Sequence, residues 1–180
     1  MPRILDVGCG PNKFPGSIGV DFRSNTAADV LCHLDRAGLP FRDNSFDEVR
    51  AVHVVEHVSD VIATMEEFHR VARPGGTIYL VTPHFTDYSS WCDPTHHWHL
   101  NSYSFYYFYP GGRHDDGRAM WYTAARLRER RVRVRLLRLW RLIGMEFLVN
   151  HASWFRRFWE HYLCFVFRGK VMEFEFEVLK

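Results

Sequence analysis

A pair of glycines and a later aspartate form the pattern in this sequence that is best suited to bind a ligand. Gly8 and Gly10 follow the apolar residues 5–7, and a missing side chain at each lets the backbone approach a ligand closely. Asp21 ends the next short apolar run, where its carboxylate can accept hydrogen bonds from two ribose hydroxyls. The combination predicts a nucleoside-bearing cofactor, with a strand and a tight turn as the structural alternative. A dinucleotide is not favoured, because its fingerprint needs a third glycine where Lys13 stands.

Two histidines stand where predicted strands end. Histidine is the side chain best suited to take up a proton near neutral pH. We therefore predict His53 and His84 as catalytic residues. Each could instead hydrogen-bond a substrate or the backbone, so a binding role stays open.

The segment around His53 also contains metal-ligand residue types. His53, Glu56 and His57 share one face of a helix, at spacings of three and four residues. A fourth group could complete a divalent-metal site, and the candidates are Asp93, His96, His97 and His99. Because such spacing is permissive, we expect no metal and keep the first three residues as candidates.

Short parallel strands are needed to bring these residues together. Apolar runs predict strands over residues 3–7, 17–20, 29–32, 46–54 and 77–82, with the fourth at the centre of the sheet. A helical pattern starts at Ser59 or Asp60 and stops at Pro74, and at most one helical turn fits between the first two strands. Alternating strands and helices imply a mostly parallel sheet. Its ligand rim, at the carboxyl ends, would carry Gly8, Asp21, Asp35, His53 and His84.

The second half of the chain contains two segments that alternate with period two. Residues 131–136 alternate arginine with apolar residues, and residues 173–178 alternate glutamate with apolar residues. We expect an antiparallel terminal β-hairpin with cross-strand ion pairs, although the arginines could also contact RNA phosphates. Between them, the aromatic residues of 154–163 predict an amphipathic helix that covers the sheet. Residues 102–109 predict a short aromatic helix, and residues 119–130 are compatible with another.

The loop after the fifth strand is expected on the substrate side. We interpret residues 93–99 as a lid, or as a structural loop whose histidines cap backbone groups. Tyr88 and Trp91 could stack on a planar substrate, with core packing expected for at least one of them.

Composition indicates one domain of ordinary size. The 180 residues are 47% hydrophobic, so we expect a single domain over residues 1–180, with a cofactor-binding half (1–83) and a substrate-side half (84–180). The 4 cysteines form no CxxC pair, so neither a zinc knuckle nor a disulfide framework is predicted. No apolar run is long enough to span a bilayer, and no signal sequence begins the chain. We therefore expect a cytoplasmic protein.

Several motifs occur in the order that one enzyme family uses. They resemble motifs of the class I S-adenosylmethionine-dependent methyltransferases, type 11 group, and lie at residues 5–10, 21, 34–35, 43–47, 53–58 and 73–77. The resemblance implies an α/β, Rossmann-like three-layer sandwich with a mostly parallel sheet ending in an antiparallel β-hairpin. The helices that precede the first strand in many members are expected to be missing, which suggests an open or partner-completed active site.

The resemblance also implies a function and a set of site residues. The cofactor would be S-adenosyl-L-methionine, and the reaction methyl transfer to an oxygen or nitrogen of a small or carrier-linked molecule. The residues implied to bind the cofactor are Asp6, Gly8, Cys9, Gly10, Asp21, Leu34, Asp35 and His53. The alternatives are a non-catalytic S-adenosylmethionine-binding partner subunit and an RNA methyltransferase. A homodimer or a partner subunit stays open, whereas nucleic acid is not the favoured partner.

Overall fold

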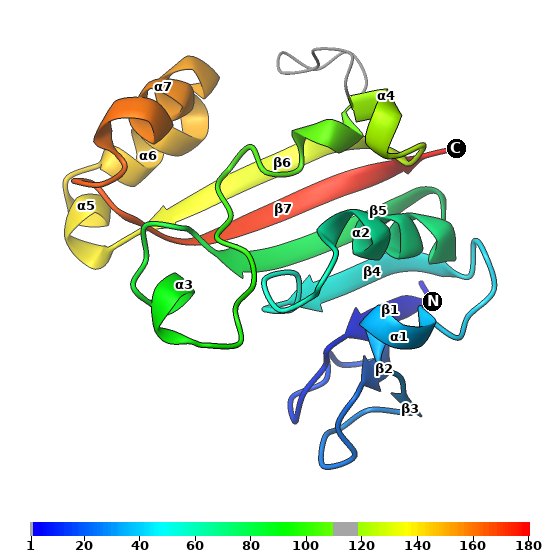
Figure 1. Ribbon diagram of the computed structural model, residues 1–180. Helices are drawn as coiled ribbons and strands as arrows, with labels where there is room; N and C mark the ends of the chain where they lie inside the picture. The colour runs from blue at the N-terminus through cyan, green and yellow to red at the C-terminus, as the bar shows by residue number, and fades with distance from the viewer. Residues whose placement is uncertain (1, 110–118) are drawn as a thin grey trace.

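Seven strands form one mixed sheet in the computed structural model, which describes residues 2–109 and 119–180 (Figure 1). The strands are β1 (Ile4–Val7), β2 (Ile18–Asp21), β3 (Val30–Leu31), β4 (Phe46–Val52), β5 (Ala72–Pro83), β6 (Arg126–Leu136) and β7 (Gly169–Leu179). Their order across the sheet is β3-β2-β1-β4-β5-β7-β6. The first five strands are parallel, and β7 runs antiparallel to both β5 and β6. The predicted parallel sheet, its antiparallel end and the central position of β4 are confirmed.

Most helices are short. They are α1 (Leu34–Ala37), α2 (Val61–Val71), α3 (Ser89–Cys92), the 3-10 helix η1 (Tyr106–Phe108), α4 (Ala119–Tyr122), α5 (Arg138–Leu142), α6 (Met145–His151), α7 (Ser153–Phe158) and the π-helix η2 (Trp159–Leu163). Asp60 is the N-cap of α2, because its side chain accepts a hydrogen bond from the Ala63 amide at 3.0 Å. Residues 8–17 contain no helix, in agreement with the prediction of one turn at most. In the described part of the chain, no helix is long and apolar enough to cross a bilayer.

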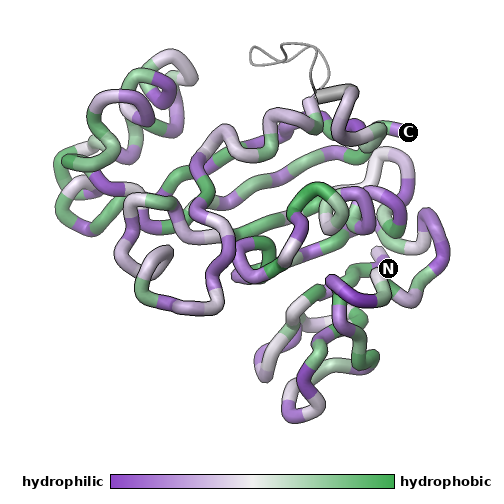
Figure 2. The backbone as a smooth tube through the Cα atoms, viewed as in Figure 1, coloured by the Kyte–Doolittle hydropathy of each residue, from purple (hydrophilic) through white to green (hydrophobic). Residues whose placement is uncertain are grey.

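The hydrophobic core lies between one face of the sheet and α2. Strand register aligns Leu5, Val49, Ile78 and Phe176 across four neighbouring strands, and each is essentially inaccessible to solvent. α2 adds Met65, and other buried side chains, against this row. Figure 2 shows hydrophobic residues along the strands and along one side of α2. The period-two alternation of the strands therefore places the apolar residues on a single face.

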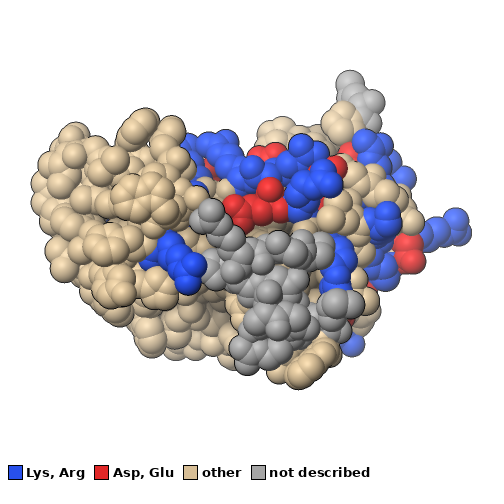
Figure 3. Space-filling view, turned by 90° about the horizontal axis from the view of Figure 1, so that it is seen from above, with Lys and Arg blue, Asp and Glu red and all other residues tan. Residues whose placement is uncertain are grey.

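The opposite face of the sheet is polar. Asp6, Arg50, Tyr79, Glu175 and Arg131 follow one another across five strands in register. The Arg50 guanidinium lies 4.3 Å from the centre of the Tyr79 ring. In Figure 3, basic and acidic side chains gather together toward the top of the view.

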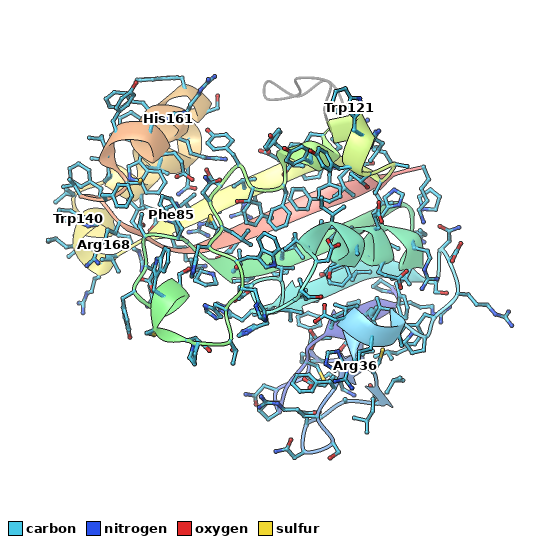
Figure 4. All side chains as sticks on the ribbon, viewed as in Figure 1. Arg36, Phe85, Trp121, Trp140, His161 and Arg168 are labelled. Atoms are coloured by element: carbon cyan, nitrogen blue, oxygen red, sulfur yellow. The ribbon has the colours of Figure 1, made fainter. Side chains whose placement is uncertain are left out.

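The predicted cross-strand ion pairs between β6 and β7 are present. Arg128 contacts Glu177 at 3.0 Å, and Arg135 contacts Glu173. The helices α5 to η2 connect these two strands, where a single helix was predicted. They gather at one end of the sheet and carry Trp140 and His161 (Figure 4). This long connection replaces a tight hairpin turn.

The free edge of β6 is covered by α6. The Asn150 side chain accepts from the Val134 amide at 2.7 Å and donates to the Val134 carbonyl at 2.8 Å. The Glu146 carboxylate accepts from the Leu136 amide at 3.0 Å. These bonds satisfy edge groups that would otherwise pair with another strand.

Some element boundaries differ from the prediction. Residues 126–130 are strand and not helix, because the pairing of β6 with β7 extends to Arg126 and Leu179. β5 begins directly after α2, so residues 74–76 lie inside the strand, next to an irregular register with β4. The predicted aromatic helix is split into α7 and η2, and only part of it covers the sheet. Trp159 is buried, whereas Trp154 and Tyr162 are exposed.

Candidate cofactor site

The glycine loop follows β1 directly. Gly8 has φ +64°, a left-handed conformation that favours glycine, and its amide donates to the Val20 carbonyl at 2.8 Å. A Cβ at Gly8 would lie 2.4 Å from Val54 Cγ2. The loop can therefore pass this close to the segment after β4 only because residue 8 has no side chain.

Asp21 fastens the glycine loop to the end of β2. One carboxylate oxygen accepts from the Gly10 amide at 3.0 Å, and the other accepts from the Arg23 amide at 2.9 Å. The residue is only 7% exposed, and it lines the cavity that opens beside the loop. Such a carboxylate is held in a fixed position, ready to accept further hydrogen bonds from a ligand.

A cavity of about 620 Å³ opens beside this loop, at the carboxyl ends of the parallel strands. Six of the residues predicted to bind or act on the ligand line it, namely Gly8, Gly10, Asp21, Leu34, Asp35 and His53. Its volume is within the usual range for small-molecule sites. The fold thus gathers residues from four separate strand ends around one space.

Asp6 and Cys9 stand behind the loop and are not among the residues that line the cavity. The Asp6 carboxylate accepts from the Phe14 amide at 2.8 Å, which fixes the far end of the loop. Burial raises the pKa of Asp6, and it also raises the pKa of the Cys9 thiol. In this conformation Asp6 holds the loop through Phe14, and Cys9 is a buried residue of the loop itself.

Asp35 and Leu34 form the opposite wall. The Asp35 carboxylate accepts from the Ser59 amide at 3.1 Å, which ties α1 to the residues just before α2. Leu34 is half-buried and presents an apolar side chain to the same cavity. This wall offers an apolar contact and an acceptor side by side.

His53 lies on the cavity with a constrained backbone. Its φ is +56°, which is uncommon for a residue with a side chain, and its amide donates to the Val81 carbonyl at 2.8 Å. Nδ1 lies 3.0 Å from Glu56 Oε1, and the imidazole is half-exposed. The contact with Glu56 therefore holds the His53 imidazole through Nδ1, and Nε2 remains available to a ligand in the cavity.

His84, the second predicted catalytic residue, is not at the cavity. Its side chain is fully buried, with Nδ1 2.7 Å from Thr86 Oγ1 and Nε2 3.1 Å from Glu160 Oε2. The close approach of Gly169 to its ring seals this position, because a Cβ there would lie 2.6 Å from His84 Cγ. The prediction that His84 faces the ligand rim was wrong, because the chain after β5 directs its side chain toward Glu160 of the η2 helix.

The metal candidates are only partly brought together. Glu56 and His57 lie close to His96, whereas His53 contacts Glu56 without joining this group. Of the four residues that could complete a metal site, His96, from the segment after α3, is the one that joins Glu56 and His57.

The segment of residues 93–99 borders the cavity. Thr95 and His97 line it, and the backbone amides of His97 and Trp98 both donate to the Glu56 carbonyl. Neither Tyr88 nor Trp91 packs in the core, so that expectation was wrong. Tyr88 is 73% exposed, and the Trp91 ring stacks on His99 with centroids 3.5 Å apart.

Residues that the sequence analysis missed also line the cavity. Phe22 and Arg23 follow Asp21, and His33 precedes Leu34. The Phe22 ring is 59% exposed and its centroid lies 5.5 Å from that of His33. An aromatic residue directly after the strand-ending aspartate is the one signal that could have indicated this contact.

Comparison with known proteins identifies relatives for part of the chain. Residues 18–80 match the model of a family described as "Methyltransferase domain". The chain is 36% identical over 98 residues to the demethylmenaquinone methyltransferase of Staphylococcus saprophyticus, an alignment that covers 42% of each protein. It is 34% identical over 99 residues to that of Chlorobaculum parvum, covering 46% of this chain and 41% of the relative. The chain therefore spans about two fifths of the length of these curated relatives.

The fold is shared with a solved structure. A S-adenosylmethionine-dependent methyltransferase from Archaeoglobus fulgidus superposes with a TM-score of 0.66 at 16% identity, covering 98% of this chain and 86% of that chain. This similarity is one of fold, and it covers nearly the whole chain, including the antiparallel end of the sheet.

Proposed function

We propose that this chain is a class I S-adenosylmethionine-dependent methyltransferase and that it transfers the methyl group of S-adenosyl-L-methionine to an oxygen or nitrogen of a small or carrier-linked molecule. The observation that carries the proposal is the cavity that joins Gly8, Asp21, Asp35 and His53. The curated relatives are named for a small-molecule substrate, which supports a small acceptor here.

The residues around the cavity fit this cofactor. Asp21 would accept from the ribose hydroxyls, and the open space beside Gly10, where an added Cβ would meet no atom within 4 Å, permits close contact with the glycine loop. Leu34 and Asp35 would contact the adenine, with Phe22 as an adjacent aromatic surface.

The cofactor supplies an electrophilic methyl carbon on a sulfonium. The acceptor's lone pair forms the new bond to that carbon while the carbon–sulfur bond breaks, so the main task of the chain is alignment. We propose that His53 takes the proton that the acceptor releases. Glu56 would accept from His53 Nδ1, which leaves Nε2 unprotonated and free to act as the base.

Calorimetry with S-adenosylhomocysteine tests the proposal directly. One molecule should bind per chain, and absence of binding at about 1 mM would exclude S-adenosylmethionine chemistry, because a cofactor site normally binds far more tightly. Methyl transfer is then measured from labelled S-adenosylmethionine to a panel of hydroxyl, amine and quinol acceptors.

A non-catalytic partner subunit is the second candidate, and an exposed apolar surface favours it. The side chains of this surface are between 61% and 76% exposed, and they are Leu142, Phe147, Trp154, Tyr162 and Phe165. A second copy or another subunit could cover them. Light scattering across protein concentrations, combined with the turnover assay, distinguishes the two candidates: binding of S-adenosylhomocysteine without any turnover by the isolated chain supports the partner role.

An RNA methyltransferase is a weaker candidate. In its favour, Arg131, Arg133, Arg138 and Arg141 line a cavity of about 780 Å³ next to β6. Against it, neighbouring arginines of β6 are already paired with glutamates of β7.

A further inference from the structure

Three metal-ligating side chains meet beside the cofactor cavity. Glu56 and His57 follow β4, and His96 comes from the segment after α3. One ligand atom from each of the three lies within 4.8 Å of the others. Glu56 is fully buried and the two histidines are half-buried, so the group is a built cluster and not a surface coincidence.

Both histidines are held in a tautomer that leaves Nε2 free to bind a metal. His57 Nδ1 lies 3.2 Å from the Thr95 carbonyl and 2.9 Å from the Thr95 hydroxyl, which donates its own hydrogen to Asp93. His96 Nδ1 lies 3.0 Å from the Ser90 carbonyl. A carbonyl oxygen can only accept, so each Nδ1 carries the hydrogen and each Nε2 keeps its lone pair. Metal-binding histidines are oriented in this way by a carbonyl on the far nitrogen.

The Asp93 carboxylate does not occupy the ligating nitrogen of His96. Its nearest oxygen lies 3.8 Å from His96 Nε2, which is beyond hydrogen-bonding distance.

The third ligand is a carboxylate with an unused oxygen. Glu56 Oε1 is held by His53 Nδ1 at 3.0 Å, but the buried Oε2 has no hydrogen-bond partner among the described residues. An unpaired carboxylate oxygen in the interior is unfavourable unless a cation or a donor satisfies it.

We propose that Glu56, His57 and His96 bind a divalent transition-metal ion, with Zn²⁺ the best match to two imidazoles and one carboxylate. Three protein ligands would leave a coordination position for a further ligand, and His57 also lines the cofactor cavity, so the site would adjoin the space proposed for the cofactor. An acceptor hydroxyl bound there would lose its proton more readily. This catalytic use rests on the proposed function, whereas metal binding itself does not.

Zinc affinity, measured by competition with a chromophoric chelator, tests the site without any turnover. We expect one Zn²⁺ per chain, and Glu56→Gln, His57→Ala and His96→Ala should each weaken binding at least 10-fold, roughly the smallest loss seen when the supporting groups of a metal site are changed. His99→Ala is the matched control, because this histidine lies on the same segment but outside the cluster. Cobalt substitution should give the visible spectrum of a nitrogen- and oxygen-ligated ion, altered in His96→Ala.

Folding of each variant is checked by circular dichroism, and His57→Gln and His96→Gln provide milder replacements if an alanine variant unfolds. A stoichiometry well below one, or equal weakening by His99→Ala and His96→Ala, would overturn the proposal. S-adenosylhomocysteine binding is measured on the same samples. If the unaltered chain binds S-adenosylhomocysteine but not Zn²⁺, only the metal site is refuted, and if it binds Zn²⁺ but not S-adenosylhomocysteine, only the cofactor assignment is refuted.

Discussion

His53 Nδ1 lies 3.0 Å from the Oε1 atom of the fully buried Glu56, three residues further along the chain. The pair joins a constrained backbone position on the cavity to a carboxylate in the interior. Because Glu56 can only accept when ionised, the contact sets which nitrogen of His53 carries the hydrogen. The exposed side of the imidazole is then available to the acceptor.

Replacing His53 should therefore reduce turnover much more than cofactor affinity. We expect His53→Ala to lower kcat by about 100- to 10,000-fold, the usual contribution of a general base, and to change S-adenosylhomocysteine affinity by less than about 10-fold. Steady-state kinetics and calorimetry measure the two effects, with His161→Ala, an exposed residue of η2, as the control. Unchanged kcat in His53→Ala would exclude the histidine as the base.

Adding a side chain to the glycine loop should damage both stability and cofactor binding. Gly8→Ala combines a left-handed backbone with a Cβ 2.4 Å from Val54, and we expect a loss of about 2–4 kcal/mol in the free energy of unfolding. Gly16→Ala is the matched control, because Gly16 has φ +78° but open space around it. Urea unfolding should show only about 1–2 kcal/mol for the control, with unchanged S-adenosylhomocysteine binding.

The carboxylate at the end of β2 should matter for binding specifically. Asp21→Asn keeps the shape but removes the charge that would accept from two ribose hydroxyls, so we expect about 10- to 100-fold weaker S-adenosylhomocysteine binding. Asp29→Asn is the control, since Asp29 is paired with Lys13 and does not line the cavity. Equal affinities for the two variants in calorimetry would contradict the ribose role of Asp21.

Acid should weaken the attachment of α2 to the loop that precedes β4. Arg70 donates to both carboxylate oxygens of Glu67, one of which also accepts from the Leu39 amide, and these hydrogen bonds lower the pKa of Glu67. The carboxylate of the unfolded chain titrates near 4.5. Stability from this group is therefore present above that pH and is lost as the pH falls through the lower value of the folded state.

The comparison with Glu67→Gln isolates this effect. At pH 7 the variant should be about 1 kcal/mol less stable, a modest figure because solvent screens the partly exposed pair. The difference should shrink toward zero as urea unfolding is repeated at progressively more acidic pH. A difference in the free energy of unfolding that grows as the pH falls would contradict the predicted direction of this pH dependence.

RNA binding should be weak and only mildly dependent on salt. Arg128 and Arg135 already contact glutamates of β7, so few arginines of β6 remain to release counterions from phosphates. Fluorescence anisotropy with a single-stranded RNA between about 50 and 200 mM salt measures the slope. A steep slope that Arg133→Ala with Arg135→Ala abolishes would instead favour RNA modification.

Much of the first half of the fold is determined locally. β1 ends at Val7, directly before Gly8, and β2 ends at Asp21. At both places a short apolar run meets turn residues, so these strand ends could be predicted from the neighbouring sequence. The Asp60 cap of α2 is likewise a contact within one helical turn. The confirmed central position of β4 was predicted from the sequence, and the mostly parallel sheet with its antiparallel end is what the resemblance implies.

Contacts between distant segments decided the rest. His84 directly follows a strand, as His53 does, but Glu160 and Gly169 approach it from 76 and 85 residues away and bury it. The extension of β6 to Arg126 depends on Leu179, which is 53 residues away in sequence. His96 meets Glu56 and His57 only because the segment after α3 folds back onto β4. The sequence by itself determined which residues stand at strand ends, and tertiary packing alone decided which of those ends stay open, because burial depends on partners that local spacing does not encode.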